Sequence, residues 1–90
     1  MLEVVMATRF RRDTKLMERR GLKMTKLREV IMLLAQEIEL PVRYHDHLLS
    51  GSWKDHRECH VEPDWLLIYQ LQEGQILFAR TGTHADLFAK

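Results

Sequence analysis

Helix-like and strand-like hydrophobic patterns divide the chain into two halves. Alternation over residues 2–6 predicts a short strand. A strongly charged stretch over residues 8–20 predicts a helix that ends at Gly21, a residue favoured just past a helix C-terminus. The inward positions of this helix are Phe10, Thr14 and Met17.

A second helix shows the clearer amphipathic pattern. Thr25 is its predicted capping residue, and Pro41, which cannot continue a helix, is its predicted end. The inward positions are Leu27, Val30, Ile31, Leu34 and Ile38. We interpret these residues as core, because their spacing is that of one helix face.

The second half of the chain predicts a β-sheet. Residues 44–54 contain the turn sequence Ser-Gly-Ser and show no period, which indicates a loop. Strands are predicted at residues 57–61, 65–71 and 75–81, and residues 72–74 join the last two as a hairpin. Both hairpin strands are apolar on both faces, which places them in the middle of the sheet. The fold class is therefore α+β, with a sheet of about four strands.

The hairpin also permits a prediction of geometry. If Leu71 pairs with Gln75, the same register places Arg80 opposite Leu66. Arg80 then lies near the turn that precedes Trp65. The side chains expected to converge at this end of the sheet are His60, Asp64, Arg80 and His84.

Length and composition restrict the kind of protein. Ninety residues form one domain, 1–90. The single cysteine, Cys59, has no partner for an internal disulfide, which fits a reducing compartment. The sequence shows neither the apolar core of a signal peptide nor a run long enough to span a membrane. We therefore expect a cytoplasmic protein without membrane contact.

Charge is distributed unevenly along the chain. Residues 1–43 contain ten Lys or Arg and six Asp or Glu, a net charge of +4, whereas residues 44–90 carry −3. The basic residues of the helical half are Arg9, Arg11, Arg12, Lys15, Arg19, Arg20, Lys23, Lys26 and Arg28. Such a cluster is either a solvated helix face or a surface that contacts a polyanion.

Side chains that transfer protons concentrate in the second half, which contains all five histidines. Cutting RNA without a metal requires a base for the 2′-hydroxyl, a cation at the phosphate and an acid for the leaving 5′-oxygen. Arg80 suits the phosphate, because its guanidinium is permanently charged. His60, oriented by Asp64, and His84 suit proton transfer, and His47 in the predicted loop can close over a substrate.

Each of these side chains also has a simpler structural interpretation. Isolated histidines are more often surface or hydrogen-bonded residues, and we interpret His45 and His56 in that way. Trp65 or Phe88 can stack on a nucleotide base. Alternatively, Phe88, which is near the end of the chain, can pack against the protein and anchor the C-terminal segment. A zinc site is disfavoured, because the histidines and Cys59 match none of the usual zinc spacings.

Three motifs taken together resemble one protein family. They are residues 44–54 (YHDHLLSGSWK), 57–69 (RECHVEPDWLLIY) and 80–88 (RTGTHADLF). In this combination the chain resembles the YafQ-type toxins of the RelE/ParE superfamily, closely over the carboxy-terminal half and by pattern and length over the helical half. Leu48, where the family often has Pro, and Glu58, in place of Asp, are departures that remove no catalytic group.

The resemblance implies a metal-independent, cofactor-free ribonuclease toxin with a RelE-like fold, two amino-terminal helices packed on a curved, mainly antiparallel sheet. Such a toxin enters the ribosomal A site and cuts messenger RNA to a 2′,3′-cyclic phosphate and a 5′-hydroxyl. The implied catalytic positions are His47, His60, Asp64, Arg80, His84 and Phe88. The implied RNA contacts are Trp65, Lys54, Arg11, Arg12, Lys15 and Arg19.

The implied partners are a cognate antitoxin, the ribosome with its 16S RNA, and operator DNA only through the antitoxin complex. The free toxin is expected to be a monomer. Two other functions fit the same fold. One is a ParE-like toxin that inhibits DNA gyrase without cutting RNA, and the other is an inactive relative that binds antitoxin and helps repress its operon. The histidine-rich site argues against the gyrase inhibitor. The inactive relative stays open as an alternative, because the surroundings of a side chain, and not its identity alone, set its pKa.

Overall fold

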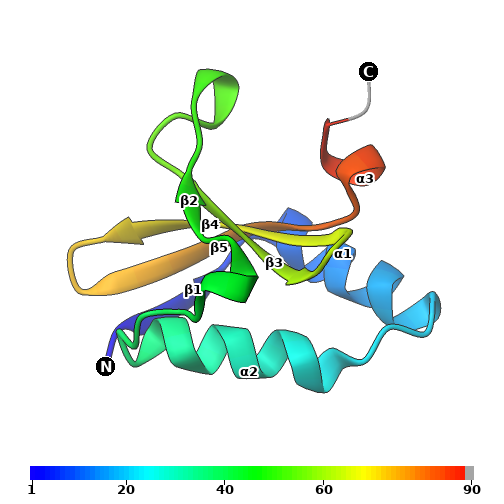
Figure 1. The fold of residues 1–90 in the computed structure, drawn as a ribbon, viewed down its shortest axis with the longest axis horizontal. Helices are drawn as coiled ribbons and strands as arrows, with labels where there is room; N and C mark the ends of the chain where they lie inside the picture. Colours follow the sequence, from blue (N-terminus) through cyan, green and yellow to red (C-terminus); the bar gives the residue numbers. More distant parts are fainter. Residues whose placement is uncertain (89–90) are drawn as a thin grey trace.

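Two helices cover one face of a five-stranded sheet in the computed structural model, which describes residues 1–88 (Figure 1). The chain begins with β1 (Glu3–Met6), α1 (Thr8–Arg19) and α2 (Met24–Ala35). It continues through η1 (Val42–Tyr44), β2 (His47–Leu48), η2 (Gly51–Trp53), β3 (Arg57–Glu62), β4 (Trp65–Gln72), β5 (Gln75–Gly82) and α3 (His84–Phe88). The predicted α+β class and the two amino-terminal helices are confirmed.

The strand order is β1-β5-β4-β3-β2. All neighbouring strands are antiparallel except β1 and β5, which run parallel. The prediction of about four strands was short by β2, which lies in the segment predicted as a loop. A strand of two residues is too short to produce an alternating pattern. The placement of β4 and β5 in the middle of the sheet is confirmed.

The core lies between the helices and one face of the sheet. Buried residues of α1, α2, β3, β4 and β5, with Leu40 from the segment after α2, form one cluster: Phe10, Met17, Leu27, Val30, Ile31, Leu34, Leu40, Cys59, Val61, Trp65, Leu67, Tyr69, Ile76 and Phe78. The inward stripe predicted for α1 is correct at Phe10 and Met17, which are 1% and 0% exposed. No helix among residues 1–88 is both long and apolar enough to cross a membrane.

The predicted limits of α2 were wrong at both ends. Lys23, not Thr25, precedes the first helical residue, and no side chain caps it. The helix ends six residues before Pro41, because Glu37 adopts φ +60° and the amides of Glu37 and Ile38 donate to the carbonyls of Leu34 and Leu33. These two bonds close the helix end in a Schellman motif, which needs no proline. Ile38 is therefore 47% exposed instead of part of the core.

A bulge in β5 sets the direction of the side chains beyond it. Tyr69 pairs with Phe78 but Ile68 pairs with Arg80, so Ala79 has no partner on β4. Phe78 faces the helices, and without the extra residue Arg80 would face them too. The predicted register, with Arg80 opposite Leu66, was wrong by two positions.

Candidate active site

Pairing across the strands aligns the site residues in two rows on the face of the sheet away from α1 and α2. Paired residues on neighbouring strands point to the same face. The first row consists of His47, Glu58, Ile68 and Arg80. The second row consists of His60, Leu66 and Gly82. Leu66 and Ile68 are fully buried and form the floor between the polar side chains.

Glu58 is the buried carboxylate of the first row, at 5% exposure. Its Oε1 lies 3.5 Å from His47 Nε2 and also 3.5 Å from His60 Nε2. The Nδ1 atoms of the two rings face carbonyl oxygens, of His45 at 2.6 Å and of Pro63 at 3.2 Å. A carbonyl only accepts, so each Nδ1 carries the hydrogen and each Nε2 is the atom that can take up a proton beside Glu58.

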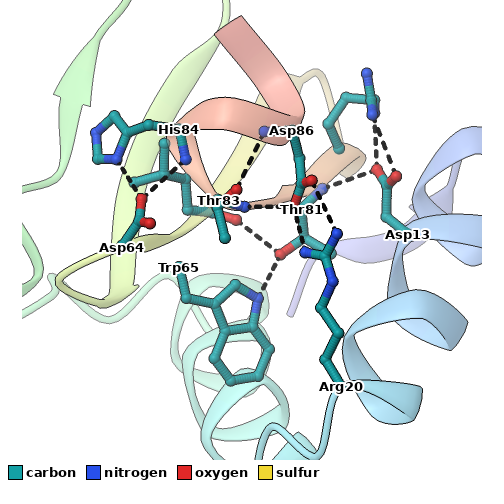
Figure 2. A network of polar contacts seen from close by, with 10 residues as sticks. Asp13, Arg20, Asp64, Trp65, Thr81, Thr83, His84 and Asp86 are labelled. Carbon is teal, nitrogen blue, oxygen red and sulfur yellow. Dashed lines mark hydrogen bonds and ion pairs between the residues drawn. The ribbon is translucent and has the colours of Figure 1, made fainter. Parts of the chain in front are cut away.

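Asp64 pairs with His84, which corrects the expectation that it orients His60. Its Oδ1 accepts hydrogen bonds from the ring Nδ1 of His84 at 2.6 Å and from the backbone amide of His84 at 2.9 Å (Figure 2). The backbone hydrogen bond is the larger cause, and the side-chain hydrogen bond the next, of a lowered pKa for the Asp64 carboxyl. His84 Nε2 is consequently the free nitrogen of a histidine held by a carboxylate.

The aromatic rings gather around His60. Its centroid lies 5.8 Å from that of His84, 6.4 Å from His47 and 5.4 Å from His45. The Phe88 ring lies 6.5 Å from that of His84 and is 40% exposed as a residue. The structure therefore brings together five expected residues, His47, His60, Asp64, His84 and Phe88, and adds His45. The sequence did not predict His45 or Glu58 as site residues. His45 was interpreted as a surface residue and Glu58 as part of a strand, and neither pattern shows which side chains lie beside them in the fold.

Asp46 fixes the segment that carries His45 and His47. Its Oδ1 accepts the Tyr69 hydroxyl at 2.6 Å and Arg57 Nε at 3.3 Å. Burial, followed by the hydrogen bond to Asp46, raises the pKa of the Tyr69 hydroxyl, so it stays a donor. The loop is thereby attached to the core strand β4 and not free to swing as a whole.

α3 is attached to the body of the protein through Asp64, which binds His84, and through Arg20, which binds Asp86 (Figure 2). Thr83 and Asp86 exchange hydrogen bonds, the amide of each donating to the side chain of the other at 2.9 and 3.1 Å. Arg20, at the end of α1, contacts both Asp86 oxygens at 2.6 and 3.1 Å. Gly82 permits this packing, because a Cβ there would lie 3.0 Å from the Asp86 side chain. These contacts set the positions of His84 and Phe88.

Arg80 lies in the row of Glu58, two strands away and thus about 10 Å along the sheet. Its side chain forms a two-point ion pair with Asp13 of α1, with Nε–Oδ2 at 2.7 Å and Nη2–Oδ1 at 3.2 Å. Of the four side chains expected to converge, His60, Asp64 and His84 meet. Arg80 shares their face but is held at the β5 edge.

Trp65 does not fit its expected contact with RNA. The residue is 1% exposed, and its indole N–H donates to the Thr81 hydroxyl at 2.9 Å inside the core (Figure 2). The remaining expected RNA contacts are exposed: Lys54 follows η2, and Arg11, Arg12, Lys15 and Arg19 lie on α1. Burial raises the pKa of the Cys59 thiol, and the residue is 0% exposed, so it is a core residue.

A metal site requires several donor side chains around one point. Among residues 1–88, no three or more His, Cys, Asp or Glu side chains are placed to hold one metal ion.

Comparisons with known proteins agree on one family. The model of the family described as "Bacterial toxin of type II toxin-antitoxin system, YafQ" matches residues 2–89. The mRNA interferase toxin YafQ of Escherichia coli K12 is 49% identical over 80 residues, which cover 88% of this chain and 87% of that protein.

Two solved structures show the same fold. The crystal structure of the E. coli DinJ–YafQ complex contains a chain that is 44% identical, with a TM-score of 0.91 over 98% of this chain and 99% of the other. The crystal structure of a metal-bound toxin from Helicobacter pylori is 38% identical, with a TM-score of 0.92 over 98% of this chain and 100% of the other.

Proposed function

The chain belongs to the YafQ family of bacterial toxins of type II toxin–antitoxin systems, and on this basis we propose that it cuts messenger RNA in the ribosomal A site by acid–base catalysis. The support from its relatives is that the E. coli member is an mRNA interferase. The support from its own geometry is one observation. His60 and His84 lie 5.8 Å apart between ring centroids, and each is beside a different carboxylate.

Two separate carboxylate–histidine groups suit a reaction that needs one base and one acid. His84, with Nδ1 hydrogen-bonded to Asp64, has the arrangement of a general base whose positive charge a carboxylate stabilises. His60 and His47 share Glu58 and can pass one proton between them. We assign the base to His84 and the acid to His60, with His47 assisting.

The proposed reaction is a transesterification in which the ribose 2′-oxygen displaces the 5′-oxygen from phosphorus. His84 Nε2 takes the proton of the ribose 2′-hydroxyl, and the 2′-oxygen forms a bond to phosphorus. The bond from phosphorus to the 5′-oxygen breaks, and His60 protonates that oxygen. The products are a 2′,3′-cyclic phosphate and a 5′-hydroxyl. Arg80 stabilises the charge on the non-bridging phosphate oxygens.

Substrate binding uses the exposed residues around this site. Phe88 is accessible for stacking on a base next to the cut, whereas Trp65 is buried. Arg11, Lys15 and Arg19 recur every four residues on α1 and can follow an RNA backbone, together with Arg12, and Lys54 lies at the opposite edge of the sheet. The ribosome supplies such a backbone in its 16S RNA.

A type II antitoxin is the expected inhibitor, and the support is that the E. coli relative was crystallised with DinJ. The H. pylori relative is metal-bound in its crystal structure, whereas among residues 1–88 of this chain no three His, Cys, Asp or Glu side chains are placed to hold one metal ion, and we propose a reaction without a metal. Cleavage that persists after EDTA treatment, in ribosomes re-supplied with magnesium only, supports this choice. Loss of cleavage that zinc or copper restores contradicts it.

The first experiment is tightly controlled expression in bacteria with mapping of messenger RNA 5′ ends. Wild-type protein should create new ends inside translated codons, and His84→Ala and Arg80→Ala should not. Growth arrest without new ends, together with lost supercoiling activity of gyrase, would favour a ParE-like binder instead. Absence of arrest from a folded, antitoxin-binding protein would indicate an inactive relative.

A modified substrate separates the base from the acid. RNA with sulphur in place of the scissile 5′-oxygen has a leaving group that needs no protonation. This substrate should restore cleavage by His60→Ala but not by His84→Ala. Rescue of His84→Ala alone would exchange the two roles, and rescue of neither would contradict acid catalysis by these histidines.

A further inference from the structure

Arg80 is held by a carboxylate that belongs to a helix 67 residues earlier in the chain. Asp13 accepts hydrogen bonds from Arg80 Nε at 2.7 Å and Nη2 at 3.2 Å, and from the backbone amide of Thr81 at 3.1 Å (Figure 2). The side chains of Asp13 and Arg80 are each 13% exposed. The pair is therefore mostly enclosed, and screening by solvent is weaker there than at the surface.

The topology explains why Asp13 can reach this place. β1 pairs with β5 only as far as Met6 and Phe78, so the outer edge of β5 is free beyond that point. The amide of Ala7 donates to Phe78 at 3.0 Å, and α1 starts there and runs beside the free edge. Asp13 occupies the edge position that a strand would otherwise fill, and it binds the outward amide of Thr81.

We propose that Asp13 is a positioning residue for Arg80, which holds the guanidinium in the orientation that it needs to stabilise the cleaved phosphate. This inference rests on the function proposed above. A carboxylate that binds the Nε and Nη2 edge fixes the plane of the guanidinium and leaves the Nη1 group outside the pair. Preorganised donors stabilise a transition state because they need no rearrangement during the reaction.

Asp13 also brings a negative charge close to a site that receives a phosphate. The pair as a whole is neutral, so it adds little to attraction of RNA in the ground state. Removing Asp13 should therefore leave RNA binding unchanged or slightly tighter while it slows cleavage. Removing Arg80 should weaken both, because the donor itself is lost. This split separates a positioning role from a general loss of structure.

The test is single-turnover cleavage of a labelled messenger RNA on bacterial 70S ribosomes, with rate measured against toxin concentration. Asp13→Ala should lower the maximal rate at least about 10-fold without raising the half-saturating concentration. Asp13→Glu should recover part of the loss. Glu18→Ala, which removes the same charge from an exposed position of α1, should behave as wild type.

A cycle with Arg80→Ala completes the test. Once Arg80 is absent, Asp13→Ala should cause no further loss of rate. An Asp13→Ala protein that cuts at the wild-type rate overturns this inference and leaves the proposed function standing. A further loss in the Arg80→Ala background, or a fall confined to melting temperature, also overturns it. Wild-type protein that occupies the ribosome without cutting overturns the proposed function itself.

Discussion

The buried hydrogen bond between Trp65 and Thr81 should contribute measurably to stability. The Thr81 hydroxyl, at 0% exposure, accepts the indole N–H at 2.9 Å and donates to the Leu66 carbonyl at 2.7 Å. Thr81→Val keeps the shape of the side chain but leaves the indole N–H without a partner. An unpaired buried donor costs about 1–3 kcal/mol, and the lost bond to Leu66 adds roughly 1 kcal/mol. We expect a total of about 2–4 kcal/mol.

The measurement is urea unfolding followed by far-ultraviolet circular dichroism. For a domain of this size, a loss of about 2–4 kcal/mol corresponds to a fall in Tm of roughly 10–30 °C. Thr81→Ser is the matched control, because it keeps the hydroxyl and removes only one methyl group. Its expected cost is about 1 kcal/mol.

A double-mutant cycle checks the cause of the loss. Trp65→Phe removes the N–H, so Thr81→Val in that background leaves no donor unpaired. The cost of Thr81→Val should therefore fall by about 1–3 kcal/mol when Trp65 is absent. An equal cost in both backgrounds would refute the argument, because the loss would then come from packing alone.

Three further predictions concern the site and its attachment. Phe88→Ala should raise the half-saturating toxin concentration for cleavage about 5-fold or more, from lost base stacking, whereas folded Trp65→Phe should stay within about 3-fold of wild type. Glu58→Gln should lower the maximal rate about 10–100-fold at unchanged Tm, measured by single-turnover cleavage. The Arg20 hydrogen bond is the main cause that holds the pKa of Asp86 below its ordinary 3.8, so the pair stabilises fully above that pH and less as pH falls toward the folded pKa. Asp86→Asn should therefore flatten the unfolding free energy against pH between about pH 5 and pH 2, and an unchanged slope would contradict it.

The sequence predicted most of the elements because periodicity reports burial directly. Phe10 and Met17 on α1, and the apolar strands β4 and β5, are buried where the pattern placed them. The end of α2 was not predictable in the same way, since Glu37 at φ +60° gives no compositional signal of a left-handed residue. Glycine is the usual marker of that conformation.

The site was predicted in its residue types but not in its pairings. A bulge adds one residue without changing composition, so the extra Ala79 and the resulting row of Glu58 and Arg80 were invisible in the pattern. The choice of His84 over His60 as partner of Asp64 depends on how α3 returns over the sheet. Such contacts follow from tertiary packing, which local spacing does not encode.

Each carboxylate at this site serves a side chain from a different segment of the chain. Glu58 of β3 lies beside His47 of β2, Asp64 of the β3–β4 turn binds His84 of α3, and Asp13 of α1 binds Arg80 of β5. None of these three pairs can form within one helix or strand, because each joins two different segments. The histidines proposed to transfer protons therefore depend on the docking of β2 and α3. Arg80, which we propose stabilises the phosphate, depends on α1. A ligand that displaced α3 from Arg20 would thus impair the histidines and leave Arg80 in place. A ligand that moved α1 would disturb both groups, because Asp13 of α1 holds Arg80 and Arg20 at the end of α1 holds α3.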